Sequence, residues 1–203
     1  MGKVIAVCMS DRKGLQKHDV NTAHFSAEWG IDGDAHAGNW HRQVSLLSAD
    51  KIEAFNKRGA NVIPGAFGEN LVVEGFDFRA LPVGTLLRCG DVLLEMTQIG
   101  KECHSHCEIY KKMGECIMPR EGVFARVLEP GSISVGDDMS IEKREGHFPW
   151  QAAVITLSDK AAAGARKDES GPAIAKRLRE ASYEVVEEIV IPDDERVLKQ
   201  QLI

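Results

Sequence analysis

The sequence lacks the features of a membrane or secreted protein. No apolar run approaches the roughly 20 residues that a membrane-spanning helix needs. The opening stretch, MGKVIAVCMS, has no apolar core of a signal peptide. It also lacks the serine or threonine that an N-terminal myristoylation signal places soon after Gly2. We therefore expect a cytoplasmic protein that does not bind a membrane.

The sequence also has no excess of basic residues. Lysine and arginine number 25 against 31 aspartates and glutamates, and residues 1–150 and 151–203 are each net acidic. Nucleic-acid binding relies on clustered positive charge, so we expect no nucleic-acid partner. A small anionic ligand needs only a few local arginine and lysine side chains, and it stays a candidate.

Cysteine is scarce, and its pattern excludes a disulfide framework. The five cysteines are odd in number and not spaced like those of a small secreted domain. Cys8 and Cys89 stand in strand-like apolar segments, so we expect both to be buried packing or turn residues. Cys103, Cys107 and Cys116 remain for other roles.

Residues 1–145 have the pattern of a mostly-β domain. Short apolar and β-branched runs alternate with Gly-rich turns, which favours a barrel. We expect a hairpin that turns at residues 89–91 and a second strand pair that turns at residues 136–137. One helix is predicted over residues 48–59 and a weaker one over residues 107–115.

The pattern changes after a predicted linker at residues 146–150, where Pro149 interrupts any regular element. Residues 151–203 then read as strand, helix, strand and a second helix, with Ser170 as the N-cap of the first helix. This order predicts a βαβ unit with a right-handed crossover. Two strands are too few for an independent parallel sheet, so we expect the incomplete start of a longer α/β domain.

The stretch KECHSHCEIY contains four potential metal ligands within five positions. It suits a metal site, a loop around one working thiol, or a polar turn. His104, if protonated, would lower the pKa of the Cys103 thiol and favour a thiolate that binds a soft metal or carries sulfur. Structural zinc sites usually use two separated ligand pairs. A zinc-binding structural or interaction module remains an alternative, with the ligands Cys103, His106, Cys107 and Cys116.

A second loop, WGIDGDAHAGNWHRQV, offers Asp32, Asp34, His36 and His41. Carboxylates and imidazoles are ligands for zinc or manganese. The Asp-Gly-Asp sequence is equally typical of a turn whose carboxylates bond their own backbone.

A glycine-containing loop lies in IPGAFGENL. Gly65 and Gly68 flank an apolar pair ahead of a strand, which would leave backbone N–H groups free to face an anion. Asn70 adds a side-chain donor. The alternative is a tight turn between strands.

Five segments in this order and spacing resemble the MOSC domain: GIDGDAH, HRQVSLLS, GAFGENL, LPVGTLLRCGDVLLEMTQIGKEC and GVFARVLEPGSISVGDDMSI. This family is named for the C-terminal domain of molybdenum cofactor sulfurase. The resemblance covers nearly all of residues 1–145. It implies a MOSC-type β-barrel with one or two helices and a role around the molybdenum cofactor (molybdopterin). The family's invariant cysteine falls on Cys103, which implies a single thiol that ligates molybdenum or relays sulfur.

Residues 151–203 resemble the start of the molybdopterin adenylyltransferase family of the MogA/MoaB type. The resemblance lies in AAVITLSDKAAAGARKDESGPAIAKRLREASYEVV. The family's later Gly-rich nucleotide loop has no counterpart after Gly171, so we do not expect adenylyltransferase activity. The resemblance implies cofactor-binding roles for Ser158, Asp159, Asp168 and Ser170.

Together the resemblances imply a MOSC β-barrel that binds, carries or sulfurates the molybdenum cofactor, joined to an incomplete MogA/MoaB-like segment. Arg42, Gly68 and Asn70 would hold the pterin phosphate. Arg120 is a second candidate for this anion, because a guanidinium pairs with phosphate in a bidentate manner. Molybdoenzymes that accept the cofactor are the expected partners, and enzyme and carrier both stay open. A molybdenum-dependent reductase of N-hydroxylated compounds, as some MOSC proteins are, is a further alternative.

Overall fold

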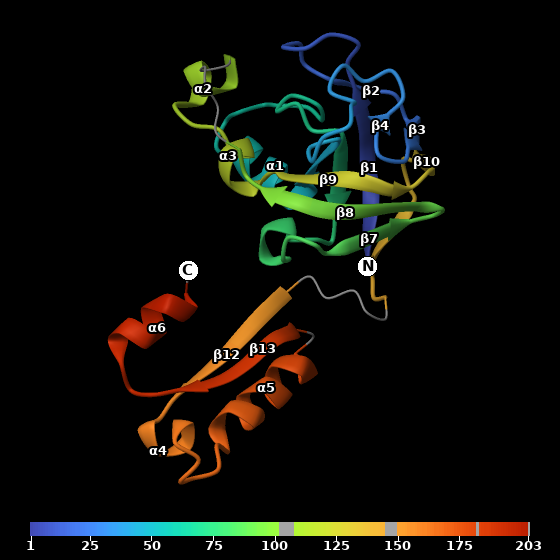
Figure 1. Cartoon of the computed structure of the whole chain (residues 1–203). Helices are drawn as coiled ribbons and strands as arrows, with labels where there is room; N and C mark the ends of the chain where they lie inside the picture. Colours follow the sequence, from blue (N-terminus) through green and yellow to red (C-terminus); the bar gives the residue numbers. More distant parts are fainter. Residues whose placement is uncertain (102–107, 145–149, 182, 203) are drawn as a thin grey trace. The chain divides into compact units, whose positions relative to one another are not determined.

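The computed structural model divides the chain into two compact units, Met1–Lys143 and Arg144–Ile203, which we describe separately (Figure 1). No helix among the described residues is long and apolar enough to cross a membrane. The structure describes residues 1–101, 108–144, 150–181 and 183–202.

The first unit is built around a closed β-barrel. Its strands are β1 (Gly2–Met9), β2 (His18–Asp19), β3 (Thr22–Ser26), β4 (Gly30–Ile31), β5 (Val44–Ser48), β6 (Leu71–Glu74), β7 (Leu86–Cys89), β8 (Val92–Ile99), β9 (Val123–Glu129), β10 (Gly131–Ser134) and β11 (Asp138–Glu142). Seven of them pair in the order β11-β7-β8-β9-β5-β6-β1, and β11 pairs again with β1 to close the barrel. Only β5 and β6 run parallel among these barrel strands. The predicted mostly-β barrel is confirmed.

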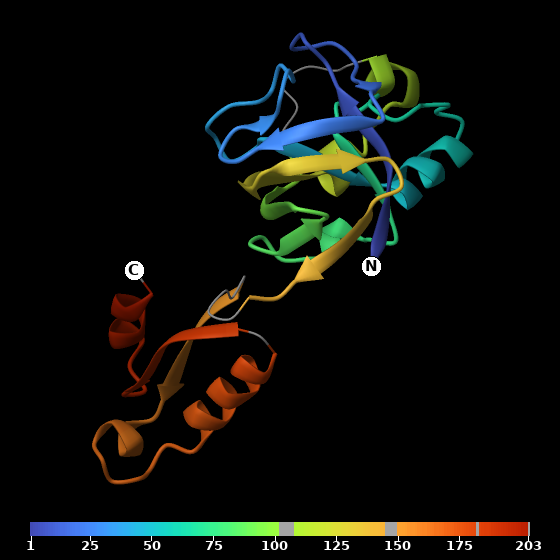
Figure 2. The same ribbon diagram turned by 90° about the vertical axis from the view of Figure 1, so that its right-hand side faces the viewer.

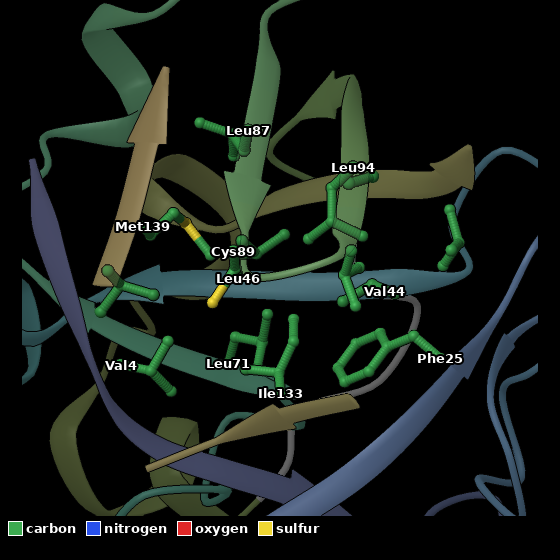
Figure 3. Close-up of a cluster of buried hydrophobic side chains, with 14 of the residues drawn as sticks. Val4, Phe25, Val44, Leu46, Leu71, Leu87, Cys89, Leu94, Ile133 and Met139 are labelled. Carbon is green, nitrogen blue, oxygen red and sulfur yellow. The ribbon is translucent and has the colours of Figure 1, made fainter. Parts of the chain in front are cut away.

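Neighbouring residues of the barrel strands point to opposite faces, because side chains alternate along a strand. Leu46 and Leu71 lie in the cluster that fills the barrel (Figure 3). Leu47 and Val72, one position further along each strand, belong to a second cluster outside it. The strands are therefore buried on both faces at this point, and all five residues of β5 are buried, including Ser45 and Ser48.

Helix α1 (Ala49–Lys57) lies on the outside of the barrel (Figure 2), where its residues join the outer cluster. Ile52 and Phe55 are buried one turn apart on its inner face. Ser48 occupies the N-cap position, and Gly59 adopts a φ of +93° just beyond the helix. The helix predicted over residues 48–59 is confirmed. Three short helical segments complete the unit: η1 (Phe78–Ala80), α2 (Glu108–Met113) and α3 (Met118–Glu121).

The two predicted strand pairs have different outcomes. Strands β7 and β8 form the expected hairpin, with Gly90 at a φ of +55° in the turn. Strands β10 and β11 do flank Gly136, but they do not pair with each other. Strand β10 joins β3 and β4 in a separate sheet, whereas β11 pairs with β7 and β1. The second predicted pair is therefore wrong in its partners.

The second unit is a βαβ arrangement. Strands β12 (Trp150–Leu157) and β13 (Tyr183–Ile191) pair in parallel, and helix α5 (Ser170–Glu180) connects them and packs on them. Helices α4 (Asp159–Ala162) and α6 (Glu195–Gln201) follow the two strands. The predicted order of strand, helix, strand and second helix is confirmed for β12, α5, β13 and α6, and the short helix α4 is an element that was not predicted. The linker predicted at residues 146–150 lies, apart from Trp150, outside the described residues.

Candidate functional site

A buried carboxylate, Asp34, joins three loops of the first unit. Its Oδ2 accepts from Lys17 Nζ at 3.0 Å, from Asn70 Nδ2 at 3.1 Å and from the backbone N–H of Ser10 at 3.3 Å. Its Oδ1 accepts from the N–H of His36 at 2.8 Å. We call these five residues the Asp34 hub. They tie together the loop after β1, the loop before β5 and the turn before β6.

Lys17 and Asp34 form an ion pair whose side chains are only 2% and 1% exposed. Burial lowers the pKa of Lys17, although the Asp34 carboxylate acts in the opposite direction. Burial would raise the pKa of Asp34, but the contacts from His36 and Lys17 outweigh it and lower that pKa. The carboxylate stays ionised at neutral pH, and it already has its partners within the protein. Within the described residues, no group of three or more His, Cys, Asp or Glu side chains could hold a metal ion.

Asn70 lies at the centre of the same network and is 1% exposed. Its amide NH₂ donates to Asp34 Oδ2 and, at 3.0 Å, to the carbonyl oxygen of Cys8. Its Oδ1 accepts from the N–H of Ser45 at 3.0 Å and from the Ser45 hydroxyl at 2.9 Å. Both donors and both acceptor positions of the amide are thus in use. A direct hydrogen bond from Asn70 to a cofactor would require one of these contacts to break. The four contacts instead indicate that Asn70 holds the surrounding loops in place.

The loop between Gly65 and Gly68 does bind a carboxyl group, but that group belongs to the protein's own Glu69, whose pKa is raised by burial. The fully buried carboxylate of Glu69 accepts from the N–H of Gly65 at 2.7 Å and from the N–H of Phe67 at 3.0 Å. The N–H groups of Ala66 and Gly68 donate to backbone carbonyls. Our expectation that these N–H groups are free is therefore wrong. A Cβ at Gly65 would lie 2.2 Å from the carbonyl oxygen of Lys17, whereas a Cβ at Gly68 would meet nothing within 4 Å.

Arg42 presents a positive charge that no carboxylate of the described residues pairs with. Its Cζ lies 4.8 Å from the centroid of the Trp40 ring and 5.6 Å from that of the Phe124 ring. Its Nε is buried and has no hydrogen-bond partner among the described residues. Aromatic rings thus hold the guanidinium, and no carboxylate within the described part of the chain compensates its charge. Arg120 differs, because it is 60% exposed and pairs with Glu115 at 3.2 Å.

Arg42 lies close to the strand that leads to Cys103. Gln98 of β8 is the register partner of Phe124, and its Oε1 lies 2.9 Å from His41 Nε2. Thr97 Oγ1 donates to the carbonyl oxygen of Phe124 at 3.2 Å. Strand β8 then ends at Ile99. The next predicted ligands lie outside the described residues: Cys103, His104, His106 and Cys107.

The other cysteines behave mostly as packing residues. Cys8 and Cys89 are fully buried, as predicted, and burial raises the pKa of each thiol to about 12. Neither is a thiolate at neutral pH. Cys116, the remaining ligand of the zinc alternative, is half-buried and packs against the outer cluster.

In the second unit, the predicted residues gather at the carboxyl end of strand β12. Ser158 and Asp159 follow this strand directly, and Asp159 Oδ1 accepts from the N–H of Asp193, which follows β13, at 3.0 Å. Ligands of open parallel sheets bind beyond this edge. The Ser158 hydroxyl caps α4 by accepting from the N–H of Ala161 at 3.3 Å.

Asp168 closes the same edge at the start of α5. Its Oδ1 accepts from the N–H and hydroxyl of Ser170 and from the N–H of Gly171, and its Oδ2 accepts from Thr156 Oγ1 at 2.9 Å. Burial raises the pKa of Asp168, but these hydrogen bonds outweigh it and lower that pKa. Our prediction of Ser170 as the N-cap is wrong, because α5 begins at Ser170 and Glu169 occupies the N-cap position. The side chain that accepts from the first N–H groups of the helix is that of Asp168.

Two protein families match the chain. Residues 32–140, more than half of its 203 residues, match the MOSC domain, and residues 153–203 match the family described as a probable molybdopterin binding domain. No curated protein matches the chain.

Solved structures agree with the barrel. The YuaD protein from Bacillus subtilis is 19% identical, with a TM-score of 0.60, over 71% of this chain and 98% of that chain. YiiM from Geobacillus stearothermophilus is 17% identical, with a TM-score of 0.55, over 71% of this chain and 76% of that chain. At these identities the likeness shows the fold alone. The two family matches support a molybdenum-cofactor-related role, and the chain belongs to the MOSC domain family.

Proposed function

We propose that the first unit binds the molybdenum cofactor and carries or sulfurates it. The observation that most supports this proposal is Arg42, whose guanidinium lies between the rings of Trp40 and Phe124 without a carboxylate partner among the described residues. A cation held in this way is available to an anion from outside, and a guanidinium matches the oxygens of a phosphate. A phosphate of the cofactor would therefore be bound by Arg42.

The other residues have distinct roles in this proposal. Cys103 supplies the thiol that ligates molybdenum or relays sulfur, and β8 brings the chain toward it from beside Arg42. Asn70 and the Gly68 turn shape the site, and Arg120 is the second candidate for the anion. When bound, the cofactor supplies the molybdenum centre that is carried or sulfurated.

The second unit would contribute a further cofactor-binding edge. Its hydroxyl and carboxylate groups gather beyond the carboxyl end of β12, where α5 also begins. This edge suits the polar substituents of a small ligand. The residues proposed to bind there are Ser158, Asp159, Asp168 and Ser170.

Arg42→Gln tests the anion site, with Arg58→Gln as the matched control. Arg58 also lies over an aromatic ring, that of Phe55 at 5.6 Å, but it pairs with Glu115. Each variant is co-expressed with an active cofactor pathway, and its pterin and molybdenum contents are measured after purification. We expect Arg42→Gln to reduce cofactor retention about tenfold or more, because a charge-assisted contact contributes roughly 1.5–3 kcal/mol. Arg58→Gln should stay close to the parent.

Cys103→Ser and Cys107→Ser test the thiol in the same assay. Serine keeps nearly the same volume but stays protonated at neutral pH, so Cys103→Ser should abolish molybdenum ligation or sulfur relay while folding is retained. Cys107→Ser should be close to silent. Equal losses in both variants, with stoichiometric zinc in the parent, would support the zinc-binding module instead. Unfolding of Arg42→Gln would mean that Arg42 is structural.

A further inference from the structure

Trp40 combines exposure with a fixed orientation. The residue is 38% exposed and lies in the loop that precedes β5. Its indole Nε1 donates to the carbonyl oxygen of His36 at 3.0 Å, and the N–H of His36 is itself held by Asp34. The ring therefore cannot turn freely, because the Asp34 hub fixes the backbone to which it is bonded. A large apolar ring kept at the surface in one orientation is suited to contact a flat partner.

The neighbouring Arg42 gives this ring a second element of recognition. The guanidinium carbon lies 4.8 Å from the Trp40 ring centroid, and the buried Nε has no partner among the described residues. A ligand that met both groups would need a planar ring for the indole and an anionic group for the guanidinium. Stacking on an aromatic side chain and a charge-assisted hydrogen bond are independent contributions that add when one ligand carries both groups.

We propose that Trp40 is a stacking platform that selects ligands in which a planar heteroaromatic ring is joined to a phosphate. This inference rests on the proposed function, and it assigns the ring of the cofactor to Trp40 and the phosphate to Arg42. Trp40 would thus distinguish a pterin phosphate from phosphate alone, which Arg42 by itself does not.

Binding of three probes separates the two contributions: a pterin monophosphate, the unphosphorylated pterin and inorganic phosphate. Dissociation constants are measured by equilibrium dialysis for the parent, Trp40→Ala, Trp40→Phe and Arg42→Gln. Trp29→Ala is the control, because Trp29 is another surface indole, 50% exposed. We expect Trp40→Ala to weaken pterin monophosphate binding about tenfold or more and to leave phosphate binding unchanged. Trp40→Phe keeps an aromatic face but loses the hydrogen bond to His36, so its affinity for pterin monophosphate should lie between those of the parent and Trp40→Ala. Arg42→Gln should weaken both probes that contain phosphate.

A spectroscopic measurement reports stacking directly. The chain has three tryptophans, so Trp29→Phe with Trp150→Phe leaves Trp40 as the only indole. Pterin monophosphate should quench its fluorescence, and inorganic phosphate should not. The matched control replaces Trp40 and Trp150 and leaves Trp29, which corrects for absorption of light by the pterin and should show no further quenching.

The outcomes distinguish the failure of this inference from the failure of the proposed function. If the parent binds none of the probes, the proposed function fails and the platform fails with it. If the parent binds pterin monophosphate and Trp40→Ala binds it equally well, only the platform is wrong. Equal losses of pterin monophosphate and inorganic phosphate in Trp40→Ala would show that Trp40 merely positions Arg42.

Discussion

The buried ion pair between Lys17 and Asp34 can be examined by removing its partners one at a time. Asp34→Asn keeps the size of the side chain but removes the charge that faces Lys17 Nζ at 3.0 Å. Lys17→Met removes the cation and keeps an apolar stem, and a third variant carries both changes. Because both native side chains are almost fully buried, a charge left without its partner cannot be hydrated unless the surrounding chain moves.

We expect Asp34→Asn to be the most destabilising of the three. Removing one partner of a buried ion pair costs roughly 3–5 kcal/mol. The loss has an upper limit, because Lys17 can release its proton instead of remaining as an unpaired buried charge. For a lysine of ordinary pKa, this release costs about 4–5 kcal/mol at pH 7. Lys17→Met should cost less, because Asp34 keeps hydrogen bonds from Ser10, His36 and Asn70. The double variant should recover part of the loss, as no buried charge then lacks a counterion.

The pH dependence follows from the directions of the two pKa shifts. The pKa of Asp34 is lowered, so its contribution to stability is present above the ordinary carboxyl pKa of about 4 and is lost as the pH falls below it. In Asp34→Asn the pKa of Lys17 falls further, and the unfolded chain binds the extra proton. The stability of this variant should rise with pH by up to about 1.4 kcal/mol per unit. The advantage of the parent over Asp34→Asn should therefore grow as the pH falls from 9 to 7, and it is lost only in acid, where Asp34 itself becomes protonated.

Unfolding in urea provides the assay, in a Trp150→Phe background in which all tryptophan fluorescence comes from the first unit. At about 3 kcal/mol, Asp34→Asn should also lower the melting temperature by roughly 10 °C. Two results would refute the reasoning. One is a loss below about 1 kcal/mol, which is the range of an exposed ion pair. The other is a loss that does not change between pH 7 and pH 9.

Two further predictions concern backbone and domain structure. Gly65→Ala should destabilise the barrel clearly more than Gly68→Ala in the same urea assay. Both residues have a positive φ, but only at Gly65 would the added Cβ meet a backbone carbonyl oxygen, that of Lys17, at 2.2 Å. Equal losses of stability in the two variants would contradict this close approach. Ending the chain after Gly146 should leave the urea transition of the first unit in place, because each unit has its own compact set of contacts, and loss of folding would show that the units depend on each other.

Local patterns in the sequence predicted the elements of the fold but not all of their partners. Strand β5, helix α1 and the β7–β8 hairpin follow from apolar runs, helical spacing and a Gly-containing turn, all of which lie within a few residues. The β10–β11 pair was predicted from the same kind of signal. It is wrong because closure of the barrel gives β11 two partners, β1 and β7, that are far away in the sequence.

The candidate site, like the fold, could be predicted from the sequence only in part. Arg42 could be proposed from its charge and its motif, but its lack of a carboxylate partner depends on the rings of Trp40 and Phe124. Lys17 stands in a polar stretch of the sequence, and its burial depends on contacts with residues far away in the chain. Its backbone N–H donates to the carbonyl oxygen of Gly65 at 3.1 Å, and its Nζ pairs with Asp34. Trp40 follows Gly38 by two residues in a polar loop, and this pattern already indicates an aromatic side chain at the surface.

The Asp34 hub connects the stability of the barrel to its proposed binding site. A buried ion pair contributes little stability compared with apolar packing of the same volume, so its main effect is to specify one arrangement. Here that arrangement holds His36, whose carbonyl oxygen orients Trp40, and thereby the ring beside Arg42. A site that is already ordered binds without the entropic cost of fixing its side chains. We therefore infer that loosening the hub weakens the binding of ring-bearing anions before it unfolds the barrel, since Trp40 depends on the hub through a single hydrogen bond.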